Sequence, residues 1–317
     1  MLSRVAERMY WFGRYSERIE NTARLLSVYS NVLLDLPVGI KKLWEDLINI
    51  TGNKESFNKI YKRPTERNVV KYMLTDKTNP ASLVCAVSNA RENARTTREI
   101  IPTEAWEKIN ELYLYVQKNG DKALKQSSRH KILNNIITYC NQTTGLLSGF
   151  MSHGIPYNFI QIGMNLERAD MTTRIVDVGC VNLLEEQDHI PDAYDDILWM
   201  NVLRSLSAFQ MYRQHVQDRV NGTDVVNFLI KDPDFPRSVI HCLEEIEDCF
   251  KKLPEHDRML REITHTQRVI GNMDTRVLIK SGLHEFIDEI QIHFADLHSM
   301  LGETWFGHST SQTQQSA

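Results

Sequence analysis

Apolar side chains recur every three to four residues through most of this chain, in long stretches that are poor in turn-forming residues. This spacing is typical of amphipathic α-helices. Proline, glycine and asparagine separate the helical stretches and set their expected limits. The sequence therefore predicts an all-α protein of about 10 to 13 helices. The main helices are expected over residues 3–34, 79–99, 102–117, 129–150, 156–184, 191–220, 236–252, 255–270 and 275–301, with shorter ones before residues 77 and 231.

The same series of landmarks occurs twice, about 150 residues apart. Residues 13–24 read GRYSERIENTAR and residues 163–174 read GMNLERADMTTR, and both fit the pattern G-x3-E-R-x-[ED]-x-T-x-R. A Leu-Trp pair and a Val-Val segment then follow in the same order in both halves. The sequence predicts an internal duplication, with one helical repeat over residues 1–151, a second over 152–308 and a disordered tail over 309–317. We expect one pseudo-twofold bundle, because each amphipathic helix needs a partner surface.

Composition restricts the class of partner and the compartment. The 37 basic and 41 acidic residues are interspersed and give a net charge of −4, so the sequence offers no basic surface for nucleic acid. We expect no membrane span, because no run of about 18 apolar residues occurs, and the first residues lack the features of a signal peptide. Five cysteines without metal-type spacing indicate reduced thiols in a cytoplasmic protein.

The repeated segment places a small residue, two acids and an arginine on one helix face. Because an α-helix turns about 100° per residue, these side chains fall within a sector of roughly 100°. They are Gly13, Glu17, Glu20, Asn21 and Arg24 in the first repeat and Gly163, Glu167, Asp170 and Arg174 in the second. Strongly apolar residues flank the first of these stripes. We therefore expect the charged stripe to point inward.

A third segment, ARENARTTR at residues 90–98, carries Arg91, Arg95 and Arg98 on one helix face. The register set by Ser82 and Ser238 places no arginine at the matching positions of the second repeat. Guanidinium groups suit carboxylates and phosphates, so this segment and the two stripes could form one cluster that neutralises itself or holds a small anion. The alternative is a buried ion network that fixes helix register while adding little net stability.

Metal and cofactor chemistry has little support in the sequence. Glu262 and His265 form one E-x2-H pair, and His284, Asp288, Glu289 and His293 follow on the next expected helix. Dimetal sites in helical bundles need two such pairs and two further carboxylates, so we predict no metal and no cofactor, with Glu262 and His265 as the candidates if a metal binds. Asp192, Asp195 and Asp196 form a single acidic turn of the kind that holds magnesium diphosphate, but acids are also favoured in any first helical turn.

Five segments together resemble the bacterial alpha-E domain family. They read MLSRVAERMYWFGRYSERIENTARLL, NPASLVCAVSNARENARTTREIIPTEAWEKIN, FIQIGMNLERADMTTRIVD, SLSAFQMYR and FPRSVIHCLEEIE, and the resemblance covers nearly the whole chain apart from the polar tail. It implies an all-helical fold and, as partners, ATP-grasp amide ligases and transglutaminase-like proteins that make or process a peptide-like molecule. The family's signature positions correspond to Glu17, Arg18, Arg24, Arg91, Glu92, Asn93, Arg95, Glu167, Arg168 and Arg174.

Three functions remain open from the sequence. The first is an accessory or substrate-binding protein of an ATP-grasp ligase, whose Glu/Arg cluster binds a small carboxylate-bearing or zwitterionic ligand or docks the ligase. The second is an enzyme that uses Glu17 or Glu167 as a general base, or a carboxylate and histidine metal site. The third is a scaffold. The predicted ligand-binding residues are Glu17, Arg18, Glu20, Arg24, Arg91, Glu92, Asn93, Arg95, Arg98, Glu167, Arg168, Asp170 and Arg174.

Overall fold

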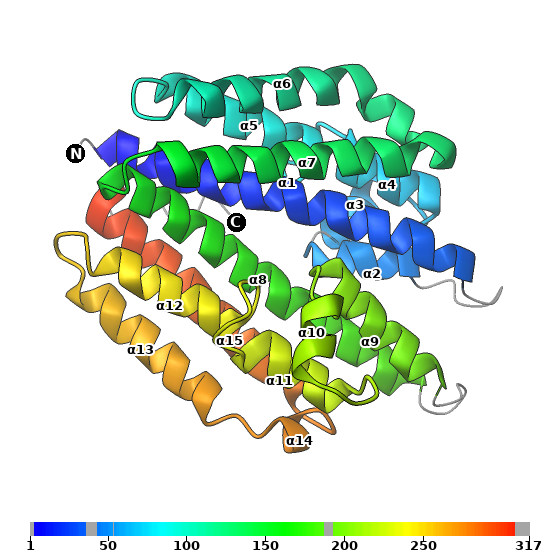
Figure 1. Ribbon diagram of the computed structural model, residues 1–317. Helices are drawn as coiled ribbons and strands as arrows, with labels where there is room; N and C mark the ends of the chain where they lie inside the picture. Colours follow the sequence, from blue (N-terminus) through cyan, green and yellow to red (C-terminus); the bar gives the residue numbers. More distant parts are fainter. Residues whose placement is uncertain (1–2, 36–42, 53, 187–192, 308–317) are drawn as a thin grey trace. The chain divides into compact units, whose positions relative to one another are not determined.

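The computed structural model describes residues 3–35, 43–52, 54–186 and 193–307, and every regular element in these ranges is helical (Figure 1). The all-α prediction is therefore confirmed, while the predicted tail at 309–317 lies outside the described residues. The α-helices are α1 (Ser3–Asp35), α2 (Leu43–Ile50), α3 (Lys54–Ile60), α4 (Glu66–Leu74), α5 (Leu83–Thr96), α6 (Thr103–Asn119), α7 (Gln126–Phe150), α8 (Ile155–Glu186), α9 (Ala193–Ser205), α10 (Phe209–His215), α11 (Gly222–Lys231), α12 (Val239–Phe250), α13 (Asp257–Gly271), α14 (Thr275–Leu278) and α15 (Leu283–Leu301). A 3-10 helix follows α6 at Gly120–Leu124, and a π-helical turn follows α15 at Gly302–Phe306.

The described chain divides into two compact units. Unit 1 takes its residues from 1–14, 152–200 and 208–317, and unit 2 takes its residues from 15–151 and 201–207. One boundary, between Met151 and Ser152, coincides with the expected boundary between the repeats, but α1 and α9 each contribute to both units. The internal duplication itself stays a prediction.

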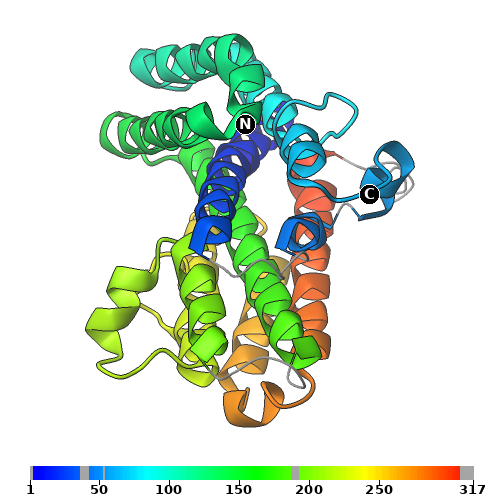
Figure 2. The same ribbon diagram turned by 90° about the vertical axis from the view of Figure 1, so that its right-hand side faces the viewer.

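Unit 1 is built around α8. The helices α12 and α15 run beside α8, and α13 packs against α12 and α15 (Figures 1 and 2). Leu243 and Ile246 of α12 and Ile287 and Ile290 of α15 are almost completely buried. Each such side chain contributes about 1.5–3 kcal/mol when it leaves water, so the shared apolar core fixes the order of these helices.

Unit 2 contains α5, α6 and α7 side by side, with α4 near the 3-10 helix (Figure 1). One fully buried arginine connects its elements. Arg129 of α7 is 1% exposed and donates hydrogen bonds to the carbonyl oxygens of Ala123 and Leu124, to Ser30 Oγ on α1 and to Glu66 Oε1 on α4. Because guanidinium carries five N–H donors in one plane, this single side chain can bind four acceptors from three elements, the 3-10 helix, α1 and α4.

Two glycines set the closest approach of α1 and α8. A Cβ atom built on Gly13 would lie less than 3.0 Å from the carbonyl oxygen of Ile160, and one built on Gly163 would lie equally close to the carbonyl oxygen of Tyr10. Only glycine lets two backbones approach this closely. Gly163 lies 150 positions after Gly13, and Ile160 lies 150 positions after Tyr10. The two contacts are therefore equivalent under a single shift of 150 residues in sequence. The glycine shared by the two charged stripes therefore has a packing role.

Two of the expected helices are broken, which raises the number of α-helices to fifteen in the described ranges. The helix expected over 191–220 ends at Ser205, and α10 starts only after Ser207, whose φ is +53°. The helix expected over 275–301 is interrupted before Leu283 by Gly282, whose φ is +96°. Both expectations were wrong because one left-handed residue ends a helix even where the apolar pattern continues.

The segments before α5 and before α12 each contain the same type of turn. Asp76 accepts the backbone N–H of Thr78 at 2.9 Å, and Asp232 accepts the backbone N–H of Asp234 at the same distance. Aspartate favours such turns because its carboxylate bonds the backbone two residues ahead. The aspartates that match in sequence therefore have the same local structural role.

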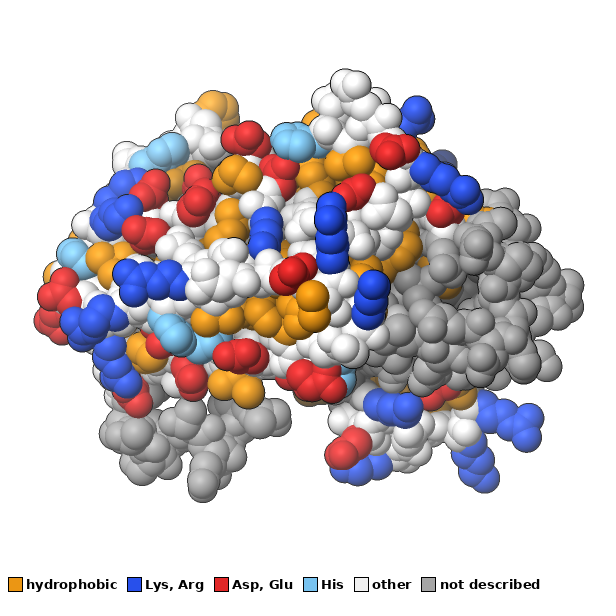
Figure 3. Space-filling view, turned by 90° about the horizontal axis from the view of Figure 1, so that it is seen from below, with side chains coloured by type: hydrophobic (Ala, Val, Ile, Leu, Met, Phe, Trp, Pro, Cys, Tyr) orange, Lys and Arg blue, Asp and Glu red, His pale blue; other side chains and the backbone are white. Residues whose placement is uncertain are grey.

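Charged side chains of both signs are scattered among apolar ones on the face shown in Figure 3, and neither sign forms a continuous field. This distribution agrees with the balance of 37 basic and 41 acidic residues. Within the part of the chain that the structure describes, no helix combines the length and apolar character that a membrane span requires.

Candidate functional site

The charged stripe of α1 is buried. Glu17 and Glu20 are 1% and 5% exposed. Arg24 donates from Nε to Glu20 Oε1 at 2.8 Å and from Nη1 to Ser207 Oγ at 2.7 Å. A buried carboxylate is costly unless it is paired, so the arginine one turn along the helix offsets much of that cost.

The stripe of α8 repeats the same internal ion pair. Arg174 Nε lies 3.0 and 3.1 Å from the two carboxylate oxygens of Asp170. The positions match those of Arg24 and Glu20, with the carboxylate four residues before the arginine in both helices. Both arginines are therefore committed to a carboxylate on their own helix, which is the geometry of a structural pair.

The thiol of Cys140, on α7, lies among the charges of the α1 stripe. Burial raises the pKa of this thiol well above its ordinary value, Glu20 and Glu17 raise it further, and Arg24 opposes them. A thiol in this setting stays protonated, and a protonated thiol is a poor nucleophile. The stripe therefore does not activate Cys140 for chemistry.

Glu167 of α8 begins a chain of hydrogen bonds that includes α1 and α15. It is 2% exposed and accepts from Arg14 Nε at 2.5 Å. Arg14 Nη1 donates to the hydroxyl of Tyr10 at 2.9 Å, and that hydroxyl lies 2.8 Å from His298 Nδ1. Since a tyrosine hydroxyl has one proton and already accepts from Arg14, it donates to His298 Nδ1.

The charges around Arg14 hold it as a cation. Burial alone would lower the pKa of Arg14, but Tyr10 and the carboxylates Glu167 and Asp170 outweigh burial and raise it. The rings of Tyr10 and Trp11 also lie within 6 Å of its guanidinium carbon. Arg14 is thus surrounded by packed and charged partners on α1 and α8, and it acts as a cross-link in unit 1.

Sequence reasoning missed Arg14, Tyr10 and His298. A signal for Arg14 was present, because the matching position in the second copy of the motif is Met164. No signal pointed to His298, which is 288 positions from Tyr10 along the chain. Only the fold of unit 1 brings those two side chains together.

The two Glu-Arg pairs of the repeated segment divide between interior and surface. Glu17 and Glu167 are buried, whereas the arginine that follows each of them is partly exposed. Arg18 lies over the ring of Tyr15, with 5.6 Å from guanidinium carbon to ring centre. Arg168 lies 3.4 Å from the side-chain oxygen of Asn165. The glutamates therefore face the core and the arginines lie at its edge.

The arginine segment of α5 packs on α6. Arg91 donates from Nε to Asn110 Oδ1 at 2.7 Å, and its guanidinium carbon lies 4.7 Å from the ring centre of Tyr113 and 5.7 Å from that of Trp106. These three partners are spaced four and three residues apart, so they form one stripe of α6. Arg91 therefore lies against two aromatic rings of α6 within unit 2.

The other residues of this segment lie at the surface. Arg95 donates two hydrogen bonds to Glu92, at 2.9 and 2.7 Å, and both side chains are more than half exposed. Arg98 is exposed, and the carbonyl oxygen of Asn93 accepts the hydroxyl of Thr97. The partners of Arg91 and Arg95 are thus Asn110 and Glu92 rather than the carboxylates of the α1 stripe. We call this surface the α5–α6 face, which comprises Arg91, Arg95, Arg98, Trp106, Asn110 and Tyr113.

Glu262 of the E-x2-H pair takes part in a hydrogen bond between helices. Glu262 of α13 lies 2.7 Å from His293 Nδ1 on α15, and the rings of His265 and His293 meet edge to face. Among the described residues, no group of three or more histidine, cysteine, aspartate and glutamate side chains is arranged to hold a metal ion. Of the acidic turn, Asp192 lies outside the described residues and Asp196 pairs with Arg219 at 2.6 Å.

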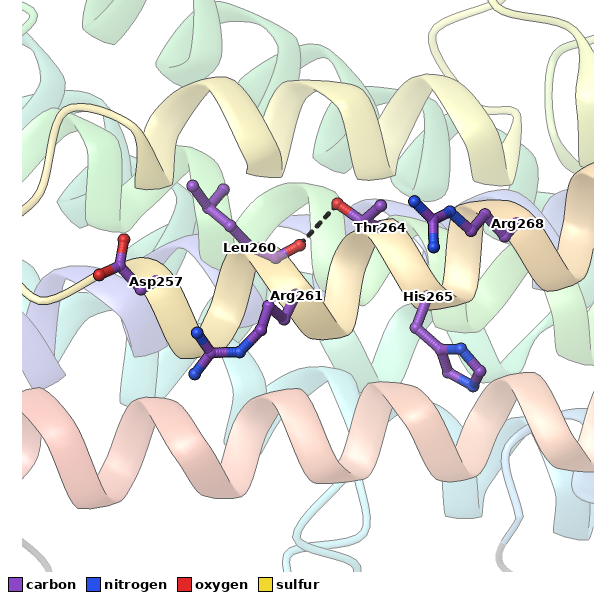
Figure 4. A pocket seen from close by; sticks show the side chains of 6 residues that line it. All are labelled: Asp257, Leu260, Arg261, Thr264, His265 and Arg268. Carbon is purple, nitrogen blue, oxygen red and sulfur yellow. Dashed lines mark hydrogen bonds between the residues drawn. The ribbon is translucent and has the colours of Figure 1, made fainter.

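A hollow of about 550 Å³ lies along α13 (Figure 4). All of its lining residues belong to that one helix, and they are Asp257, Leu260, Arg261, Thr264, His265 and Arg268. The buried side chains Met259 and Ile263 lie on the opposite face of the helix. The hollow is therefore a shallow gap between solvent-facing side chains, which gives little enclosure to a ligand.

The comparisons with known proteins cover most of the chain. A model of the Alpha-E family, described as a predicted alpha-helical domain with a conserved ER motif, matches residues 1–306. The chain is also similar to uncharacterized proteins of Mycobacterium bovis and Mycobacterium tuberculosis, at 23% and 22–23% identity over 297 residues. The matches cover 86% of this chain and 32% of each relative, so the chain spans about a third of their length. The search of solved structures found no match.

Proposed function

The chain belongs to the Alpha-E family, and on that basis we propose that it is a cytoplasmic accessory protein that docks onto an ATP-grasp amide ligase through its α5–α6 face. The ligase as partner, and a peptide-like product, follow from the family resemblance. A transglutaminase-like protein, implied by the same resemblance, is the second candidate partner.

The observation that carries this proposal is the chemistry of the α5–α6 face. Arginine, tryptophan and tyrosine are the residues that most often dominate binding energy at protein interfaces. Arg91 is already held against Trp106 and Tyr113, so little side-chain freedom is lost when a partner covers it. Arg95 lies one helical turn after Arg91 on α5, whereas Arg98 follows the end of α5 and so is not on the helix face expected for it. Both have exposed guanidinium groups that suit carboxylates on a partner.

The charged stripes of α1 and α8 support a structural role instead. Arg14, Arg24 and Arg174 each have a carboxylate partner within their own unit. Glu17 and Glu167, the candidate general bases, are 1% and 2% exposed, so a substrate has no direct access to them in this conformation. No observation of the described residues favours an enzyme over an accessory protein.

The relatives fit a module that works beside other domains. In the mycobacterial proteins the matched segment accounts for 32% of the length, so two thirds of each relative is additional chain. Additional chain beside the matched segment is what a docking module next to other domains would have. This supports docking. The activity of the additional chain is a property of the mycobacterial proteins.

Charge reversal on the α5–α6 face tests the proposal. We expect Arg95→Glu combined with Arg98→Glu to weaken binding to the ATP-grasp ligase of the same cell at least about tenfold, which equals a loss of about 1.4 kcal/mol. The measurement is calorimetric titration of the purified ligase with each variant. The control is Arg63→Glu with Arg67→Glu, which makes the same charge change at exposed positions near and within α4.

Two results would contradict the docking proposal. One is equal affinity of the α5–α6 double variant and wild type, with both folded by circular dichroism. The other is an equal loss of affinity in the control variant, which would show that only net charge matters.

A further inference from the structure

A groove of about 300 Å³ lies in unit 1 between the end of α10 and α11. It is separate from the α5–α6 face, whose residues all belong to unit 2. The side chains that give it polar character are His215 from α10, Asp224, Asn227 and Lys231 from α11, and Asp232 after α11. Unlike the hollow on α13, this groove has walls from two elements.

Asp232 is the fixed group of the groove. It is 8% exposed, and its Oδ1 accepts the backbone N–H groups of Asp234 and Phe235 at 2.9 and 2.8 Å. Its other oxygen, Oδ2, lies 3.2 Å from His215 Nε2. A buried carboxylate that is bound by backbone donors keeps its position, so it holds the imidazole at the edge of the groove.

The histidine beside this turn occurs in the second predicted repeat only. Asp76 matches Asp232 in sequence and makes the same turn, but its second oxygen accepts a hydrogen bond from the hydroxyl of Tyr61 at 2.7 Å. A phenol and an imidazole fill the same position beside the two aspartates. The turn is common to both predicted repeats and belongs to the architecture, whereas the imidazole is specific to this groove.

Side chains of opposite charge line the groove. Asp224 and Lys231 are seven residues apart on one stripe of α11, which corresponds to about 10 Å along the helix axis. Asp224 accepts a hydrogen bond from Asn221 at 2.6 Å and keeps further acceptor positions, since a carboxylate has about four. Lys231 Nζ donates to the carbonyl oxygens of Met273 at 2.5 Å and of Gly271 at 3.4 Å, which leaves one of its three N–H donors for a ligand. It lies next in sequence to Asp232, which holds His215.

We infer that this groove binds an elongated zwitterion whose amine lies at Asp224 and whose carboxylate lies at Lys231 and His215. An extended chain of three residues is also about 10 Å long, so a tripeptide matches the spacing of Asp224 and Lys231 along the helix. The volume is at the lower end of the range for ligand sites, so a short peptide fits and a large cofactor does not. Asn227, between the two charges, offers an amide for the peptide backbone of the ligand.

The first test uses trialanine as the probe and NMR titration of the ¹⁵N-labelled protein. We expect shifts of the backbone signals of α11 and of His215 that saturate with added peptide. N-acetyl-trialanine, which lacks the amine, and trialanine amide, which lacks the acid, should each bind at least about tenfold more weakly. Equal shifts with all three peptides, or no saturable shift with trialanine, would overturn the inference.

Variants assign the two ends of the groove. Asp224→Asn should remove the preference for trialanine over its acetylated form, and His215→Gln should reduce the preference over the amide. The control is Asp234→Asn, an exposed aspartate near the groove that does not line it. Unchanged preferences in Asp224→Asn, with an unchanged melting temperature, would contradict the assignment, and they would leave the docking of unit 2 unaffected.

Discussion

Arg129 shows how the fold uses a fully buried charge. It is 1% exposed and bonds four acceptors, of which only Glu66 is charged. Arg129→Met removes all four bonds and leaves two carbonyl groups without their donor, so the free energy of unfolding should fall by about 3 kcal/mol. Urea unfolding measures the change.

A matched variant separates the carbonyl bonds from the ion pair. The Glu66 side chain is 41% exposed, so Glu66→Gln should reduce the free energy of unfolding by less than about 1 kcal/mol. Equal losses in the Arg129 and Glu66 variants would show that the ion pair, and not the carbonyl bonds, is the main contribution of Arg129.

The raised pKa of His284 makes the stability of the protein depend on pH. The hydrogen bond and charge of Asp177 raise the pKa of His284 above 6.5, so this stabilisation is complete below about pH 6.5 and is lost as pH rises through the raised value. Asp288 and Glu285 act in the same direction. Burial raises the pKa of Asp177, so its own contribution also falls with rising pH, but it does so nearer to its ordinary value of 3.8.

The expected change is small, because the His284 side chain is 55% exposed. Between about pH 6 and about pH 8, the wild-type free energy of unfolding should fall by up to about 1 kcal/mol more than that of His284→Gln. Parallel pH profiles for the two proteins, measured by urea unfolding, would refute this role of His284.

Some of this residue-level detail was available from the sequence and some was not. The inward direction of Glu17 and Glu20 followed from the apolar residues that flank them. The pairing of Arg95 with Glu92 rather than with a carboxylate of the α1 stripe did not, because helix spacing gives a face of one helix and not its neighbour. The hydrogen bond between Tyr10 and His298 could not be predicted either, because it joins residues 288 positions apart in sequence.

At the scale of elements, the approach of α1 and α8 depends on two missing side chains. We expect Gly13→Ala and Gly163→Ala each to lower the free energy of unfolding by about 2–3 kcal/mol, because the added methyl group meets backbone that cannot move aside easily. Gly145→Ala is the control, since nothing lies within 4 Å of its Cβ position in α7. That variant should be stabilised by about 0.5–1 kcal/mol.

Thermal and urea unfolding of the three glycine variants measure these changes. A neutral Gly13→Ala would mean that α1 and α8 can separate slightly at no cost. In that case the glycine shared by the repeated segments would need another explanation.

The observed helix limits show which of the expected limits could be predicted from the sequence. The long helices α1 and α8 match their expected ranges closely, because their apolar patterns are long and interrupted by clear turn residues. Gly282 was a readable stop signal that the continuous apolar pattern obscured. Ser207 gave no such signal, since serine rarely adopts a left-handed conformation, and its side chain is bonded to Arg24 in the folded unit.

At the scale of the whole molecule, charged residues have two different uses. The stripes of α1 and α8 are paired within their units and shape the helical architecture, whereas the α5–α6 face presents arginine and aromatic groups to solvent. The residue pattern alone could not separate these uses, because both consist of arginines and acids at helical spacing. Burial and pairing separate them in the structure.

Hydrogen–deuterium exchange of the protein, alone and with the ATP-grasp ligase of the same cell, tests this division most directly. Amide exchange reports which backbone segments become protected when a partner binds. We expect added protection in α5 and α6, with α1 and α8 unchanged. Protection confined to α1 and α8, or no protection anywhere at saturating ligase, would contradict it.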